Sequence, residues 1–260
     1  MARFDRLELE QDPEEPAGPK NLASPTTDRD EKHWLRLADE ERRQGLYENA
    51  LRYYSRALEV DKSLASGWLG QVQMLIQLQE YPEAELWARK ALEFFRNNSE
   101  LLAGRAQACC RLGELKRAQE LCDAALRQEG QSAYRWMVRG ELILNSREDL
   151  DRHCFDKALH QDPDWLVPLE IAHIYLRYRN PTKAHSRARQ AVERAPDAAY
   201  AWYLKGYCEM KIGVDRQARQ SFRRCMDLCP NHADAKARLA EMKNRKWSLG
   251  RALRGLLGRG

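Results

Sequence analysis

The chain has 260 residues, of which 43% are hydrophobic and 32% charged, and its formal net charge is +5. This composition can bury a continuous core, and no stretch approaches the roughly 18 apolar residues of a membrane-spanning helix. The seven cysteines are an odd number without framework spacing, which favours a reducing compartment. Because the first residues include no apolar run of signal-peptide length, we expect a cytoplasmic protein.

Residues 1–30 form an acidic, proline-rich segment. Residues 1–31 hold nine acidic side chains against four basic ones, with four prolines among them. Such a segment cannot bury enough apolar surface to offset the entropy lost on folding, so we expect it to be disordered. The central part of the chain carries a small net charge for its size, which argues against nucleic acid as a partner.

Small residues recur with a fixed period across residues 31–232. One such position returns after 34, 34, 33, 33 and 34 residues, and large residues such as Trp34 and Trp68 keep a similar step. A period near 34 predicts stacked helix pairs, each too thin to bury a core alone. The six copies span about 31–64, 65–98, 99–132, 133–165, 166–198 and 199–232, and their small residues are Ala57, Ala91, Ala125, Ala158, Ala191 and Cys225.

Each copy carries the signals of two helices and a turn. In the first copy, Leu51, Tyr54 and Leu58 form one apolar stripe along a helix. The residue before a proline avoids helical backbone, so Pro163 ends a second helix. No stretch alternates at period two, and we expect no sheet. Glycines between the two helices permit the left-handed backbone that ends a helix, at Gly45, Gly113 and Gly213.

This pattern resembles the tetratricopeptide repeat family. In that family a large aromatic residue and a glycine mark the first helix, while small and aromatic residues mark the second. The last copy shows the pattern with Trp202, Gly206, Ala218, Phe222 and Pro230. The resemblance implies an all-α, right-handed α-solenoid of six helical hairpins with a C-terminal capping helix.

Two segments follow the repeats. Residues 233–246 are predicted to form the capping helix, which shields the last repeat from water. Residues 247–260 form a basic tail with a leucine stripe, which we expect to fold only on a partner or an anionic membrane. The residues expected to dock this tail are Trp247, Leu249, Leu253, Leu256 and Leu257.

Catalytic and metal-binding patterns are weak. Cys225, Cys229 and His232 have a spacing that suits a metal, but Cys225 holds a small-residue position of the repeat and no fourth ligand is evident. The sequence has no glycine-rich phosphate loop and no nucleophile or metallopeptidase motif. We therefore expect no metal, no cofactor and no enzymatic activity.

The resemblance implies that the first helix of each hairpin lines a concave groove. Relatives that grip the C-terminal carboxylate of heat-shock chaperones use Lys, Asn and Arg there. Here Leu35, Asp39 and Ala103 stand at such positions, so that clamp is absent. The shorter fourth and fifth copies leave the mapping uncertain by one residue. The expected groove residues are Asp39, Leu69, Gln73, Gln107, Tyr134, Met137, Glu141, His173, Tyr200, Tyr203 and Tyr207.

We therefore expect a non-enzymatic scaffold or adaptor that binds a peptide or protein segment in the groove. Tyr200, Tyr203 and Tyr207 share one helical face and could form an aromatic strip open to a ligand, or one or two of them could pack into the next helix. The alternative function is an accessory factor tethered to a membrane or larger assembly through its tail. The sequence does not indicate an oligomeric state.

Overall fold

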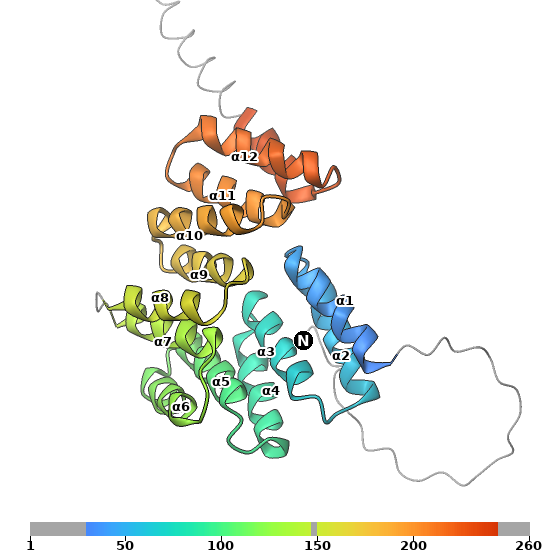
Figure 1. The fold of residues 1–260 in the computed structure, drawn as a ribbon, viewed down its shortest axis with the longest axis vertical. Coiled ribbons are helices and arrows are strands. Elements are labelled where there is room, and N and C mark those ends of the chain that lie inside the picture. The colour runs from blue at the N-terminus through green and yellow to red at the C-terminus, as the bar shows by residue number, and fades with distance from the viewer. Residues whose placement is uncertain (1–29, 147–149, 244–260) are drawn as a thin grey trace, which may run out of the picture.

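The computed structural model describes residues 30–146 and 150–243. These residues fold into helices joined by short turns, and no strand occurs among them. Consecutive helices pair into six hairpins, and a further helical stretch covers residues 233–243. The hairpins stack into a helical-repeat solenoid (Figure 1), which confirms the all-α repeat fold predicted from the period.

Helix bounds follow the predicted copies closely. The first helices of the hairpins are α1 (Glu31–Arg43), α3 (Ala65–Gln77), α5 (Ser99–Leu112), α7 (Ala133–Asn145), α9 (Leu166–Arg177) and α11 (Ala199–Lys211). The second helices are α2 (Tyr47–Val60), α4 (Tyr81–Phe94), α6 (Leu115–Arg127), α8 (Asp151–Gln161), α10 (Pro181–Arg194) and α12 (Asp215–Leu228).

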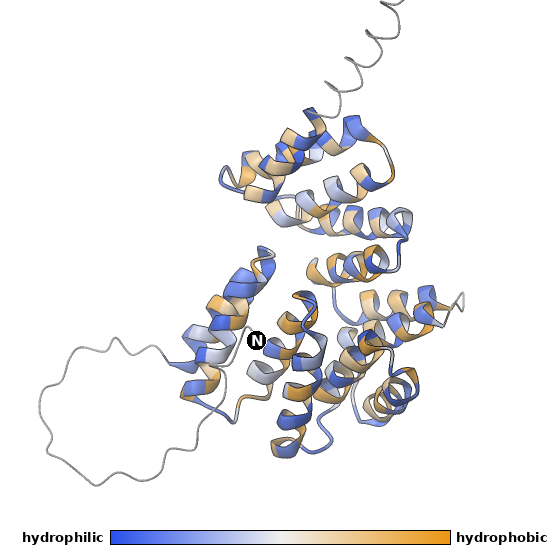
Figure 2. Ribbon diagram, turned by 180° about the vertical axis from the view of Figure 1, so that it is seen from behind, coloured by the Kyte–Doolittle hydropathy of each residue, from blue (hydrophilic) through white to orange (hydrophobic). Residues whose placement is uncertain are grey.

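The core runs between the two helical layers. Apolar and polar residues alternate around each helix (Figure 2), as expected when one face of every helix is buried. The recurring small residues let neighbouring helices approach closely. A side chain on Gly140, for example, would place its Cβ 2.6 Å from the ring of Phe155. The small residues buried at 0% exposure include Ala50, Ala57, Ala84, Ala91, Ala118, Ala125, Ala158, Ala184, Ala191, Ala218 and Cys225.

One copy departs from the small-residue pattern. Asp151 replaces the first alanine of the fourth copy and is only 1% exposed. Its carboxylate accepts a hydrogen bond from the hydroxyl of Tyr175 at 2.7 Å and pairs with the ammonium of Lys183 at 3.2 Å. The buried charge is therefore satisfied by the fifth repeat rather than by its own hairpin.

The joint between the fourth and fifth repeats is the sparsest in the solenoid. α4 lies along α5, and α10 lies along α11, whereas α9 touches α7 and α8 at few points. The joint is apolar where α8 meets α9, and there the rings of Phe155 and Tyr175 pack edge to face with centroids 5.1 Å apart. We call repeats one to four the first block and repeats five and six the second block. The connection between the blocks is narrower than those within them, although repeats four to six share one apolar core.

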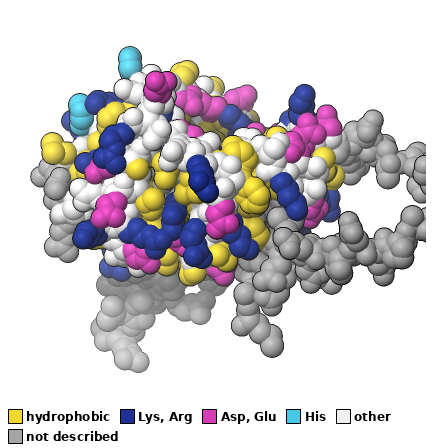
Figure 3. All heavy atoms as spheres, turned by 90° about the horizontal axis from the view of Figure 1, so that it is seen from below, with side chains coloured by type: hydrophobic (Ala, Val, Ile, Leu, Met, Phe, Trp, Pro, Cys, Tyr) yellow, Lys and Arg dark blue, Asp and Glu magenta, His cyan; other side chains and the backbone are white. Residues whose placement is uncertain are grey.

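Several predicted segments lie outside the described residues. They comprise almost all of the acidic segment 1–30, the end of the capping helix after residue 243, and the whole tail with Trp247, Leu249, Leu253, Leu256 and Leu257. Within the described part of the chain, no helix is long and apolar enough to cross a membrane. On the face shown in Figure 3, acidic and basic side chains are interspersed.

Candidate functional site

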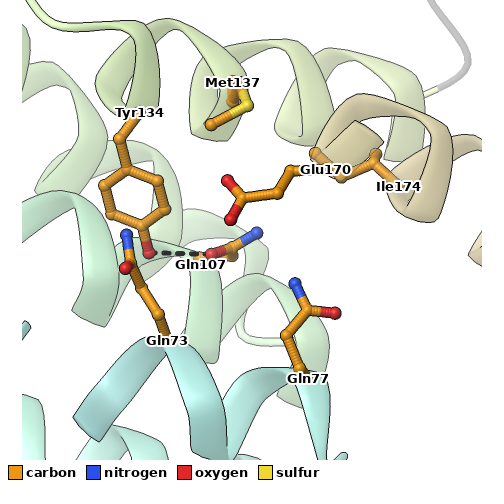
Figure 4. Close-up of a pocket in the computed structure, with 7 residues that line it drawn as sticks. All are labelled: Gln73, Gln77, Gln107, Tyr134, Met137, Glu170 and Ile174. Carbon is orange, nitrogen blue, oxygen red and sulfur yellow. Dashed lines mark hydrogen bonds between the residues drawn. The ribbon is translucent and has the colours of Figure 1, made fainter. Parts of the chain in front are cut away.

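A small pocket, partly open to solvent, lies between α3, α5, α7 and α9 (Figure 4). We call it the glutamine pocket, because three glutamine amides line it. Gln73 and Gln77 come from α3, and neither side-chain amide has a hydrogen-bond partner among the described residues. The full lining consists of Gln73, Gln77, Gln107, Tyr134, Met137, Glu170 and Ile174.

A hydrogen-bonded chain supports one wall of the pocket. The hydroxyl of Tyr134 donates to Gln107 Oε1 at 2.8 Å, and Gln107 Nε2 donates to Glu141 Oε2 at 2.7 Å. Arg111 Nε donates to the other oxygen of Glu141 at 2.6 Å. The wall is therefore preorganised, since each of these polar groups is held by the next one. Glu141 itself is fully buried and lies behind the pocket rather than in it.

The tip of the first hairpin crosses the concave side of the solenoid. This tip, residues 42–47, contacts the fifth and sixth repeats. Arg42 pairs with Glu170 of α9, and Arg43 pairs with Asp164 just before α9. Burial alone would lower the pKa of Arg42, but the carboxylate of Glu170 holds that pKa above its ordinary value. Glu170 therefore belongs both to the glutamine pocket and to this long-range contact.

His173 lies under the tip between two tyrosines. Its Nε2 atom is 3.0 Å from the hydroxyl of Tyr200 and 3.3 Å from that of Tyr47, and the two hydroxyls are 3.0 Å apart. Burial, together with the positive charge of Arg111, lowers the pKa of His173 to about 4. Burial raises the pKa of Tyr47 to about 12, so all three groups are neutral near pH 7.

This neutral histidine predicts a loss of stability in acid. Above pH 7 His173 is neutral in both states, but between about pH 6.5 and 4 the unfolded chain binds a proton that the folded chain does not. Stability should therefore fall as the pH drops through this window and should change no further below it. The loss attributable to His173 is about 2–3 kcal/mol between pH 7 and 4.

Urea unfolding at pH 7 and pH 4 checks this expectation. A His173→Gln variant should lose about 2 kcal/mol less than the parent over that interval. His153 is exposed on α8, and His153→Gln is the matched control for any general effect of removing a histidine. An unchanged pH dependence in the His173 variant would contradict the assignment.

The three tyrosines of α11 form a stacked column. Ring centroids are 5.9 Å apart for Tyr200 and Tyr203, and 6.4 Å for Tyr203 and Tyr207. Tyr200 is 8% exposed and lies beneath Gly45 of the first-hairpin tip. Tyr203 also stacks on His232 at 4.8 Å, and both Tyr203 and Tyr207 remain partly accessible. Tyr200, at one end of the predicted aromatic strip, is therefore covered by the first-hairpin tip.

The remaining predicted groove residues are spread along the solenoid. Asp39 accepts a hydrogen bond from the hydroxyl of Tyr54 within the first hairpin. Leu69 packs at the edge of the core formed by the first two repeats. Met137 is 4% exposed and reaches the glutamine pocket. Among the predicted residues, only Gln73, Gln107, Tyr134 and Met137 line the pocket together.

Several residues of the site were not expected from the sequence. Glu170 and Ile174 line the pocket, and Ile174 is one position after His173, the groove residue expected from the repeat mapping. Leu169, one position before Glu170, is fully buried in the core. Because the fourth copy is one residue shorter, the groove positions of the fifth copy shift by one residue. This shortening is the sequence signal that could have located Glu170 and Ile174. Gln77 is one helical turn beyond Gln73 on the same face of α3.

Six of the seven cysteines are buried, and Cys229 is partly exposed. Cys225 is fully buried beside Phe222 and Met242, and burial raises the pKa of its thiol to about 12. His232 stacks on Tyr203 instead of meeting Cys225 and Cys229 at a shared centre. Over residues 30–146 and 150–243, no three His, Cys, Asp or Glu side chains cluster in a way that could hold a metal ion.

Sequence comparison identifies the family. The profile of the tetratricopeptide repeat matches residues 35–99 and 169–233, which together make up half of the chain. The chain therefore belongs to the tetratricopeptide repeat family. It is also 24% identical over 126 residues to the tetratricopeptide repeat-containing protein trd-1 of Caenorhabditis elegans. That match covers 48% of this chain and 16% of the trd-1 protein.

Solved structures support the same fold. A tetratricopeptide repeat protein from Parabacteroides merdae aligns with a TM-score of 0.51 at 18% identity, covering 84% of this chain and 86% of its own. A monomeric mutant of IFIT1, solved with Gppp-AAAA, aligns with a TM-score of 0.52 at 18% identity. That alignment covers 69% of this chain and 46% of IFIT1. At these identities the likeness shows the architecture alone.

Proposed function

We propose that this protein is a non-enzymatic scaffold that binds an extended segment of a partner protein in the glutamine pocket. The observation that carries the proposal is the pair of amides from Gln73 and Gln77, which open onto the pocket without partners. Gln73 is only 8% exposed as a residue, but its amide atoms still reach the solvent of the pocket, where a ligand can replace water as their hydrogen-bond partner. A peptide backbone supplies the donor and the acceptor that each amide lacks.

The other lining residues suit the same ligand. Met137 and Ile174 offer apolar surface to a side chain of the bound segment, and the flexible thioether of methionine adapts to different shapes. Glu170 adds a carboxylate at the edge of the pocket. Membership of the tetratricopeptide repeat family supports a protein partner, because helical-repeat solenoids use their concave surfaces for binding.

A peptide display library selected against the full chain tests this proposal. Replacing both Gln73 and Gln77 with leucine, which has a similar volume, should weaken the selected peptides by about tenfold or more in isothermal titration, or roughly 1.4 kcal/mol. The matched control is Gln217→Leu, an exposed glutamine on α12, which should leave the affinity unchanged. Equal affinity for the double variant and the parent would exclude the pocket as the binding site.

The tethering alternative concerns the tail. Its residues, including Trp247 and Leu253, lie outside the described part of the chain. Membrane or assembly docking through residues 247–260 therefore stays a prediction from the sequence.

A further inference from the structure

The contact between the first-hairpin tip and the fifth and sixth repeats is unusual for a solenoid. In such proteins each repeat ordinarily touches only its neighbours. Here Arg42 reaches Glu170 across 128 positions of sequence, and Tyr47 reaches Tyr200 across 153. Figure 1 shows the tip of the blue α1–α2 hairpin directed towards α9. This contact can therefore break without disturbing any interface between successive repeats.

The interface under the tip combines polar pairs with aromatic packing, since Tyr47 also lies against the ring of Tyr200 and the apolar core of repeats four to six. Its polar part consists of two ion pairs, the hydrogen-bonded group of Tyr47, His173 and Tyr200, and the guanidinium of Arg43 lying 5.6 Å from the ring centre of Trp165. The side chains of Arg43 and Asp164 are 41% and 31% exposed, so water and salt reach that pair. Interfaces of this kind between parts of one chain usually permit relative motion.

Beside the apolar core that α9 shares with the fourth repeat, α9 also makes polar contacts with the earlier repeats. Arg177 donates to the hydroxyl of Tyr81 at the start of α4, and Tyr178 lies 3.4 Å from a carboxylate oxygen of Glu141. The apolar part of the joint lies at the opposite side, where Phe155 packs on Tyr175. A bend about that apolar contact would separate the polar pairs and would stretch the apolar core that repeats four to six share.

The glutamine pocket lies on the polar side of this joint. Gln73, Gln77 and Tyr134 belong to the first block, whereas Glu170 and Ile174 belong to the second. A movement of α9 away from α3, α5 and α7 would therefore widen the pocket. It also releases Glu170 from Arg42, so that the carboxylate becomes available to a cation on an incoming segment.

We propose that repeats five and six act as a jaw that bends at the joint between α8 and α9, and that the first-hairpin tip latches this jaw over the glutamine pocket. A partner segment that carries a lysine or arginine competes with Arg42 for Glu170 and thereby holds the jaw open. The identity of the ligand rests on the proposed function, but the bending motion does not.

Gly45 offers a steric wedge that leaves the charges unchanged. Its φ is +75°, and a Cβ at this position would have three atoms of the Tyr200 ring within 2.7 Å. Gly213 occupies the same turn in the sixth hairpin with φ +84°, and nothing lies within 4 Å of its added Cβ. Gly45→Ala and Gly213→Ala therefore impose the same left-handed backbone strain, but only Gly45→Ala pushes the latch away from Tyr200.

The full chain should be compared by small-angle X-ray scattering and by amide hydrogen exchange. We expect Gly45→Ala to increase the radius of gyration and to speed exchange in α9 about tenfold or more, with helical circular dichroism unchanged. Gly213→Ala should match the parent. If the two variants behave alike, or if only global unfolding accelerates exchange, the latch is refuted.

Swapping the charges of Arg42 and Glu170 provides an independent test if Gly45→Ala fails to fold. Arg42→Glu and Glu170→Arg should each open the jaw, and the double variant should restore the exchange rate of the parent. Failure of the double variant to restore it would overturn the proposal.

The display-selected peptides then separate the two proposals. If the jaw opens but the peptides ignore the Gln73 and Gln77 substitutions, the pocket assignment alone fails. If those substitutions weaken binding while neither wedge nor charge reversal alters exchange, the latch alone fails.

Discussion

Replacing Glu141 with alanine is expected to lower the free energy of unfolding by about 3–5 kcal/mol. The carboxylate is fully buried, and the side chain of its partner Arg111 is only 6% exposed. Without Glu141 the guanidinium would remain inside the protein with no counter-charge, which is among the most destabilising states that a single substitution can create. Gln107 would lose its hydrogen-bond acceptor at the same time.

Removing both charges provides the control. A double variant with Glu141→Leu and Arg111→Met keeps the volume and leaves no unpaired ion, so it should be clearly more stable than Glu141→Ala. Urea unfolding followed by circular dichroism measures both differences. A single variant that costs less than about 1 kcal/mol, or a double variant as unstable as the single one, would show that the pair is not desolvated as described.

The second large effect is expected at Trp68, for which substitution by alanine should cost about 3–5 kcal/mol. Trp68 is 1% exposed, its indole nitrogen donates to the carbonyl of Lys62 at 2.9 Å, and its ring packs against Trp87 at 5.9 Å. The substitution leaves a large cavity between the first two repeats and an unpaired carbonyl. Since both repeats share this core, we expect the whole N-terminal block to lose stability.

Trp202 is the matched control, because it holds the same position in the sixth repeat. Its indole nitrogen donates to the carbonyl of Pro196 at 2.8 Å, in the same geometry, but its ring is only partly buried. Trp202→Ala should therefore cost about 1–2 kcal/mol, as expected for less apolar surface removed from water. Equal shifts of the urea midpoint for the two variants would contradict this ranking.

Part of the pocket lining corresponds to groove positions expected from the repeat. Gln73, Gln107, Tyr134 and Met137 were predicted from the groove positions of the family, and they meet at one pocket. Whether they bind a partner stays a prediction. The one-residue shortening of the fourth copy hid the contribution of α9. A single deletion turns a helical position by about 100°, which exchanges a pocket residue for a core residue.

The hairpins themselves could be predicted from the sequence, because every signal that specifies them is local. The recurring alanines and aromatics specify close helix packing within about 34 residues, and glycines such as Gly45 and Gly113 specify the turns. The meeting of Arg42 with Glu170 has no such local signal. It depends on the sum of small rotations between all the intervening repeats, and an error at any one joint would move the tip away from α9. The contact of the first-hairpin tip with α9, the buried state of Tyr200 and the contribution of α9 to the pocket therefore became visible only in the tertiary structure.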